Sequence, residues 1–226
     1  MEGMKLTLIY WNVRGFAEPI KMLLEYLHTS YEEIKLEYDE QKPIEASAEQ
    51  WTKIKETYSL DFHTLPCLLD FEHKVYLSHT IAICKYLAQL YRPKMVGSAM
   101  NECAEIDALL YLGYDVRNSI IEGYEKGWEE NKGDTIKWIK NKLGYVNKFM
   151  KSRVWMSGKQ ATIADFYWCE LLEFIQSADS TIIEEYPNYK KLLRKLYVIP
   201  EVQKYKTTQM EFNMAKYLKF PFQHEQ

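Results

Sequence analysis

The chain has 226 residues, of which 47% are hydrophobic, enough to build a folded core and to exclude disordered and collagen-like classes. Its 29 Lys and Arg nearly balance 32 Asp and Glu, which gives a formal net charge of -3. This near-balance argues against nucleic-acid binders and polybasic membrane binders, because both need a basic excess. We therefore expect neither nucleic acid nor a membrane among the partners.

The amino terminus and the cysteines predict a cytoplasmic protein. No apolar run approaches the roughly 20 residues of a membrane span, and residues 1–5 contain no signal-peptide core. Four cysteines in a chain of this length are not a disulfide framework, and none lies in a CxxC pair. We expect no metal site and no redox motif.

The first 90 residues mix strand and helix patterns. Residues 5–11 alternate in the manner of a strand, and apolar residues at helical spacing follow Pro19. Residues 31–38 alternate again. Residues 65–70 and 74–77 read as short strands around a turn at 71–73, and Thr80 opens a last helix. The predicted order is β-α-β, then β-β-α.

Helix patterns alone follow the joint at Arg92-Pro93-Lys94, where proline stops the preceding helix. Residues 139–150 and 192–196 contain apolar residues at helical spacing. Residues 162–165 form a capping box, a hydroxyl and a carboxylate three residues apart before an apolar segment. The sequence predicts an α/β domain over residues 1–91 and an all-α domain over residues 92–226.

Five strings, in order and at family spacing, resemble one family. They are Tyr10-Trp11-Asn12-Val13-Arg14-Gly15-Phe16, Leu23-Leu24-Glu25-Tyr26, Gln50-Trp51 with residues 60–66 (LDFHTLP), residues 80–88 (TIAICKYLA) and residues 158–166. Together they resemble the cytosolic glutathione transferases of the mu class. The resemblance implies a thioredoxin-like N-terminal domain, an all-helical C-terminal domain, a homodimer, and glutathione as a co-substrate with no cofactor.

Tyr10 is the candidate catalytic residue. A free thiol with a pKa of about 8.5 is ionised to only a few per cent at neutral pH, and a hydrogen bond donated to the sulfur favours the thiolate. The resemblance assigns this donor to Tyr10 and a glutathione contact to Trp11. On residue chemistry alone, packing of the strand end is the more common role for a tyrosine at this place.

Glutathione contacts also follow from the resemblance around a proline. In the family, the proline at the position of Pro66 is cis, so that the backbone of the residue in the place of Leu65 meets the cysteinyl part of glutathione. Thr64 belongs to the same segment. Thr80, with His79, stands at the family's contact with the γ-glutamyl carboxylate. A helix N-terminus suits this anion, although Thr80 could simply cap its own helix.

The glycyl carboxylate would meet Trp51 and Lys55, which share one face of a helix. The alternative is a solvated amphipathic turn. Ala48 stands where mu enzymes carry a basic residue, and His79 replaces a glutamine. One carboxylate contact is therefore missing, and we expect a lower affinity for glutathione.

The remaining site residues lie beyond the joint, apart from Phe16. Asp115 is in register with a family carboxylate that reaches across the dimer to the γ-glutamyl ammonium, and otherwise it is an exposed helical carboxylate. The expected electrophile pocket is lined by Phe16, Tyr124, Phe220 and Phe222. A core or tail-docking role explains these aromatics equally well, and Tyr124 is not cleanly in register with the family's tyrosine.

The function predicted from the resemblance is conjugation of the glutathione thiolate to hydrophobic electrophiles, a detoxification reaction. A transferase-like ligand-binding or structural dimer stays open, as does a glutathione-dependent isomerase of the sigma type. The retained Tyr10 and Pro66 favour the enzyme, whereas Ala48 and His79 leave room for a carrier.

Overall fold

The computed structural model describes residues 5–37, 44–210 and 217, with the backbone alone for residues 44–48. The chain forms two compact units, one from Met1–Tyr86 with Gln209–Gln226 and the other from Leu87–Thr208. The domain boundary expected after residue 91 stays a prediction. Phe220 and Phe222, which are expected to line the electrophile pocket, lie outside the described residues.

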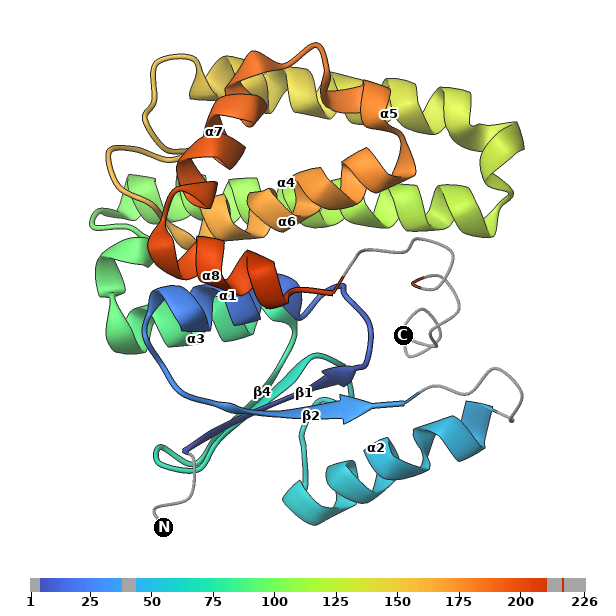
Figure 1. Ribbon diagram of the computed structural model, residues 1–226, viewed down its shortest axis with the longest axis vertical. Helices are drawn as coiled ribbons and strands as arrows, with labels where there is room; N and C mark the ends of the chain where they lie inside the picture. The colour runs from blue at the N-terminus through green and yellow to red at the C-terminus, as the bar shows by residue number, and fades with distance from the viewer. Residues whose placement is uncertain (1–4, 38–43, 211–216, 218–226) are drawn as a thin grey trace. The chain divides into compact units, whose positions relative to one another are not determined.

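A four-stranded sheet organises the first unit (Figure 1). Its strands are β1 (Leu6–Trp11), β2 (Glu32–Leu36), β3 (Cys67–Asp70) and β4 (Val75–Ser78), in the order β2-β1-β3-β4. β1 runs parallel to β2 and antiparallel to β3, which pairs with β4 as the hairpin predicted from the sequence. All six residues of β1 are buried, as expected for a central strand covered on both faces.

Helices cover both faces of this sheet: α1 (Glu18–Tyr26) and the start of α3 (Thr80–Tyr91) on one, and α2 (Ile44–Tyr58) on the other (Figure 1). Pro19 lies in the first turn of α1, where a missing N–H costs nothing. The predicted order β-α-β, β-β-α lacks α2 as an element. This helix is mostly polar. Few apolar residues, such as Trp51, are available to reveal a helical spacing in the sequence.

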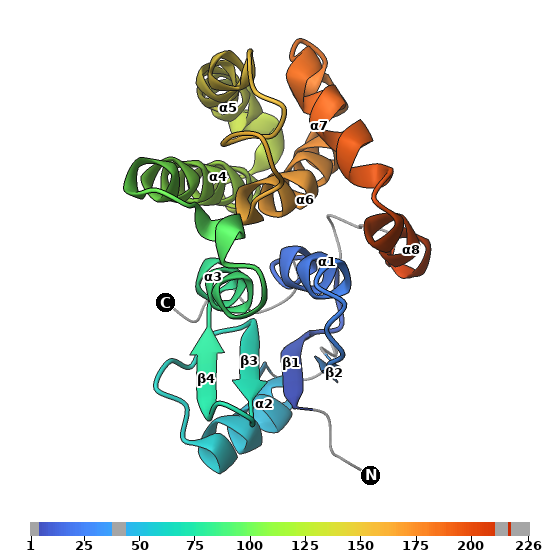
Figure 2. The same cartoon turned by 90° about the vertical axis from the view of Figure 1, so that its left-hand side faces the viewer.

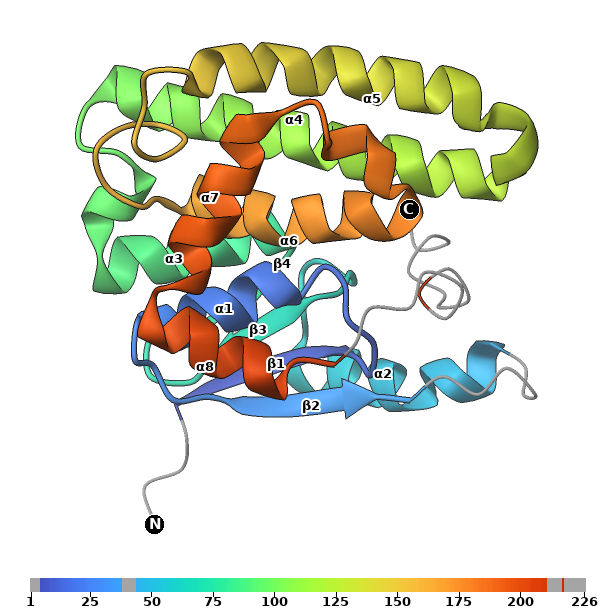
Figure 3. The ribbon, with the colours of Figure 1, turned by 45° about the horizontal axis from the view of Figure 1, so that its top comes forward.

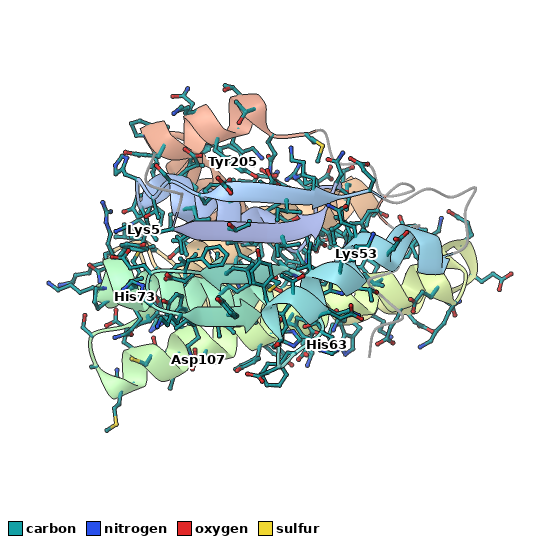
Figure 4. All side chains as sticks on the ribbon, turned by 90° about the horizontal axis from the view of Figure 1, so that it is seen from below. Lys5, Lys53, His63, His73, Asp107 and Tyr205 are labelled. Atoms are coloured by element: carbon teal, nitrogen blue, oxygen red, sulfur yellow. The ribbon has the colours of Figure 1, made fainter. Side chains whose placement is uncertain are left out.

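Asp70 fixes the turn between β3 and β4. Its carboxylate accepts hydrogen bonds from the backbone N–H groups of Glu72 (3.0 Å) and His73 (2.9 Å) and from the Tyr86 hydroxyl (2.7 Å). Burial alone would raise the pKa of Asp70, but these hydrogen bonds outweigh it and hold the pKa below its usual range. Figure 4 shows His73 at the same end of the sheet as Lys5.

The second unit consists of helices in its described part. They are α4 (Met100–Glu125), α5 (Trp128–Met150), α6 (Ile163–Ala178), α7 (Pro187–Tyr197) and α8 (Pro200–Thr208), with short 3-10 helices at Pro93–Val96 and Ser180–Ile183. α4 and α5 run antiparallel as the two longest helices (Figure 3). The all-helical second half predicted from the sequence is confirmed.

The core of this unit is centred on α6, which begins at the predicted capping box. Asp165 is fully buried and accepts hydrogen bonds from the N–H groups of Thr162 (2.8 Å) and Met156 (2.9 Å). Further along α6, Glu170 forms a buried ion pair with Arg117 of α4. None of the helices in residues 5–37 and 44–210 has the length and apolarity that a membrane span requires.

Candidate functional site

Tyr10 lies at the end of the central strand β1, where the alternation predicted it, and its side chain is buried. The backbone N–H of Phe16, in the loop that leads into α1, donates a hydrogen bond of 3.1 Å to the Tyr10 hydroxyl oxygen. A hydroxyl whose oxygen accepts a hydrogen bond becomes a stronger donor through its own proton. The loop therefore both positions the Tyr10 hydroxyl and strengthens it as a donor.

Thr80 holds this loop from the other side. Its hydroxyl donates a hydrogen bond of 2.7 Å to the backbone carbonyl of Phe16, and its side chain is buried at the start of α3. A threonine hydroxyl has a single proton to donate, and here it goes to Phe16. The backbone N–H groups of the first turn of α3, rather than the Thr80 hydroxyl, are thus the donors suited to an anion.

The segment that precedes β3 packs against the end of β4. The Leu65–Pro66 peptide bond is cis, as expected. The Ser78 hydroxyl donates to the carbonyl of Phe62 at 2.8 Å, and the His79 N–H donates to the carbonyl of Pro66 at 3.1 Å. These contacts bring Leu65 and Pro66 to the start of α3.

His79 connects β4 to α3 in an uncommon backbone conformation. Its φ of +72° lies in the left-handed region, where histidine is more frequent than most non-glycine residues. Its imidazole Nε2 lies 3.3 Å from Thr64 Oγ1, and its side chain is exposed. The structure thus brings together two residues predicted to contact glutathione, Thr64 and His79.

Trp51 and Lys55 share one face of α2, as predicted. The Lys55 ammonium lies 5.6 Å from the centroid of the Trp51 ring. The Trp51 side chain has no exposed surface, and its Nε1 has no hydrogen-bond partner in the described part of the chain. A buried indole N–H without an acceptor beside an ammonium fits a carboxylate ligand. Ala48 lies in α2, but its side chain is outside the described residues.

Cys67 follows Pro66 directly but is unsuited to be a nucleophile. Burial raises the pKa of its thiol to about 12, although a hydrogen bond with Ser78 acts in the opposite direction. A thiol with this pKa is protonated at neutral pH and therefore unreactive. Cys67 therefore supplies no thiolate to this site.

Tyr217 is a site residue that the sequence did not predict. A Cβ placed on Gly15 would lie 2.6 Å from Tyr217 Cε2 and 2.9 Å from the Tyr10 hydroxyl oxygen. The Tyr217 ring therefore packs on Gly15 beside the Tyr10 hydroxyl, and Tyr217 is fully buried. Near it in sequence, Gln209 donates a hydrogen bond of 2.6 Å to Glu18 of α1.

Four predicted residues, Asp115, Tyr124, Phe220 and Phe222, are not brought to Tyr10 by any described contact. Asp115 lies on an exposed face of α4 in the second unit. Tyr124 stacks on Trp128 at the turn between α4 and α5, with ring centroids 4.3 Å apart. Burial, then the nearby charges of Glu129 and Asp179, raise the pKa of Tyr124. Phe220 lies outside the described residues.

Known families match both halves of the chain. Residues 6–89 match the N-terminal domain of glutathione S-transferases, and residues 114–209 match the C-terminal domain. Glutathione S-transferase Mu 1 of Oryctolagus cuniculus is 32% identical over 96% of this chain and 97% of its own length. Glutathione S-transferase Y1 of Cricetulus longicaudatus is 31% identical over 91% of this chain and 92% of its own.

Solved structures share the fold. The Pi-class glutathione S-transferase of Onchocerca volvulus superposes with a TM-score of 0.76 at 22% identity, covering 97% of both chains. Prostaglandin synthase D of Nilaparvata lugens superposes with a TM-score of 0.75 at 23% identity, covering 92% of this chain and 99% of its own. The fold is a thioredoxin-like domain followed by a helical domain, and with the mu-class relatives it shows that the chain belongs to the glutathione S-transferase family of enzymes.

Proposed function

We propose that this protein conjugates the thiolate of glutathione to hydrophobic electrophiles, as a cytoplasmic detoxification enzyme. The observation that carries the proposal is the hydrogen bond from the Phe16 N–H to the Tyr10 hydroxyl. It aims the hydroxyl from a rigid strand end and strengthens it as a donor to sulfur. Lowering a thiol pKa by two units needs about 2.7 kcal/mol, within reach of one or two charge-assisted hydrogen bonds.

The rest of glutathione has suitable partners within the first unit. The Trp51 indole, which has no hydrogen-bond partner among the described residues, and the Lys55 ammonium suit the glycyl carboxylate. The N–H groups at the start of α3 suit the γ-glutamyl carboxylate, because a helix N-terminus attracts anions. The backbone of Leu65, before the cis Pro66, suits the cysteinyl part, and the partly exposed Phe16 offers apolar surface near Tyr10 for the electrophile.

We further propose that the active form is a homodimer in which Asp115 reaches the γ-glutamyl ammonium bound to the partner. Phe62 supports this proposal, because 65% of its side chain is exposed beside the predicted glutathione segment. An exposed aromatic side chain of this size favours cover by another protein surface. A two-fold contact would form both sites at once.

The catalytic proposal is tested by conjugation of chlorodinitrobenzene and by Tyr10→Phe, which removes the hydroxyl and keeps the ring. We expect turnover at neutral pH to fall at least tenfold, or about 1.4 kcal/mol, and the bound thiol pKa to rise toward its solution value. Tyr76→Phe, the same change on β4, should leave both unchanged. If the wild-type protein binds glutathione without turnover, the ligand-carrier function replaces the enzyme.

The dimer is tested by mixing subunits. In a heterodimer of Asp115→Ala and Tyr10→Phe, action of Asp115 in trans places both defects in one site and leaves the other intact. Activity should then recover toward half of the wild type. A monomer by sedimentation, or no recovery on mixing, would contradict this arrangement.

A further inference from the structure

The near-balanced net charge hides a strong separation of charge along the chain. Residues 135–164 and 186–200 contain eleven Lys and Arg and no Asp or Glu. The other 181 residues contain eighteen Lys and Arg and all thirty-two Asp and Glu. An average over the whole chain therefore says nothing about a local basic surface.

The fold brings the two basic segments together, because they form α7 and most of α5. The Tyr189 hydroxyl donates to the carbonyl of Leu143 at 2.7 Å, and the Asn188 amide donates to the carbonyl of Asn147 at 3.1 Å. Within the second unit, α5 and α7 lie on the same side, above α4 and α6 in Figure 2.

Both helices turn their cations outward, since each buries its apolar side against the other helices. The buried side of α5 contains Ile139, Leu143, Val146 and Met150, and that of α7 contains Tyr189, Leu192, Leu193 and Leu196. Six exposed cations follow from this arrangement, and we call them the α5–α7 basic face: Lys137, Lys148, Lys151, Lys190, Lys191 and Arg194.

These six cations have no carboxylate within ion-pair distance in the described part of the chain. Two neighbouring cations do form ion pairs and are not counted in this face: Lys140 pairs with Glu185 at 2.6 Å, and Arg153 pairs with Glu105 at 3.2 Å. Among the described residues, no ion pair neutralises the positive charge of the α5–α7 basic face, which favours an anionic partner.

Exposed apolar side chains lie close in sequence to these cations. Tyr145 on α5 is 63% exposed, Val154 beyond its end is 54% exposed, and Val198 at the end of α7 is 75% exposed. Lysines interspersed with tyrosine and aliphatic side chains fit the headgroup region of a bilayer, which is anionic outside and apolar beneath. The backbone of a nucleic acid is charged and would cover the two valines less well than the apolar layer of a bilayer.

We propose that the α5–α7 basic face binds the surface of membranes rich in anionic phospholipids. The contact is peripheral: cations meet the headgroups, and Tyr145, Val154 and Val198 enter the interface. It would hold the enzyme where hydrophobic electrophiles dissolve. Because the attraction acts through solvent, it weakens as salt shortens the Debye length from about 14 Å to about 4 Å between 0.05 M and 0.5 M.

Co-sedimentation with lipid vesicles tests the proposal on the full chain. We expect binding to phosphatidylcholine vesicles with about 30% phosphatidylserine at low salt, release at high salt, and no binding to phosphatidylcholine alone. The triple variant Lys148→Glu/Lys151→Glu/Lys191→Glu should bind at least about tenfold more weakly, because each cation near an anionic surface contributes several-fold. Tyr145→Ser should also weaken binding, with the charge unchanged.

A matched variant separates local charge from net charge. Lys74→Glu/Lys94→Glu/Lys126→Glu makes the same change in net charge at exposed positions outside the basic face, and it should bind as the wild type does. Equal losses in the two triple variants would overturn the proposal. Equal binding to neutral vesicles, or binding to single-stranded DNA without binding to vesicles, would overturn it too. Glutathione conjugation in solution should be unchanged in both triple variants. Failure of the membrane proposal is therefore distinguishable from failure of the catalytic proposal.

Discussion

The hydroxyl of Thr80 and the backbone of Phe16, 64 positions apart in sequence, are joined by a hydrogen bond of 2.7 Å. Phe16 in turn donates to the Tyr10 hydroxyl at 3.1 Å. The start of α3 therefore supports the loop that orients Tyr10, so a change at Thr80 is expected to affect a hydroxyl that Thr80 does not itself contact.

Thr80→Val tests this support because it removes the hydroxyl and keeps the shape. The loss of one buried hydrogen bond should lower the free energy of unfolding by about 1–2 kcal/mol. We also expect the bound thiol pKa to rise, since the loop holds Tyr10 less firmly. Titration of thiolate absorbance measures the pKa, and Thr80→Ser, which retains the hydroxyl, should behave as the wild type. An unchanged pKa in Thr80→Val would limit Thr80 to a structural role.

Gly15→Ala should disturb the packing of Tyr217. The new Cβ would lie 2.6 Å from the Tyr217 ring and 2.9 Å from the Tyr10 hydroxyl oxygen, closer than real contacts allow. We expect turnover to fall about tenfold or more as one of the two tyrosines is displaced. The double variant Gly15→Ala/Tyr217→Ala should regain part of this loss, because the ring that clashes is gone. Steady-state kinetics of Gly15→Ala, Tyr217→Ala and the double variant complete a double-mutant cycle. Purely additive effects on turnover would refute the contact between the two residues.

Asp70→Asn should destabilise the protein in a pH-dependent way. Because the folded state holds the pKa of Asp70 below its unfolded value, its stabilising contribution is present above the unfolded pKa of about 3.9 and is lost as pH falls through the folded pKa. At pH 7 we expect a loss of about 1–3 kcal/mol, narrowing toward pH 3. Urea unfolding across this range measures the difference. If the difference in the free energy of unfolding between variant and wild type did not narrow in acid, the lowered pKa of Asp70 would be contradicted.

Asp165→Ala should be among the more destabilising changes in the second unit. It strands the buried N–H groups of Thr162 and Met156, whose hydrogen bonds of 2.8 and 2.9 Å it removes. Each unsatisfied buried donor costs about 1–3 kcal/mol, so we expect about 2–5 kcal/mol in urea unfolding. Asp134→Ala, at an exposed position of α5, is the control and should change stability by less than about 0.5 kcal/mol.

Local patterns predicted much of the fold. The alternation of residues 5–11 placed β1 and Tyr10, and the hydroxyl and carboxylate at Thr162 and Asp165 placed the start of α6, because these signals act within a few residues. The helix α2 was harder to recognise, since its polar residues leave little periodicity. Short-range signals thus sufficed for elements with one strongly apolar side.

Contacts between distant segments could not be predicted in this way. The packing of Tyr217 on Gly15 joins residues about 200 positions apart, and nothing in the aromatic pattern of the C-terminal residues distinguishes Tyr217 from its neighbours. The bond between Thr80 and Phe16 is of the same kind. Tyr10, Trp51 and Pro66 were predicted through a family resemblance, which carries information about distant contacts that periodicity lacks.

The proposed reaction with electrophiles would also expose the protein's own nucleophiles to them. Cys67, Cys84 and Cys169 are buried, and burial raises the pKa of the Cys67 and Cys84 thiols well above neutral pH. Alkylation needs both access and a thiolate; all three side chains lack access, and Cys67 and Cys84 also lack the thiolate. The burial of Cys67 directly after Pro66 thus protects the cysteine next to the proposed glutathione site from alkylation during turnover.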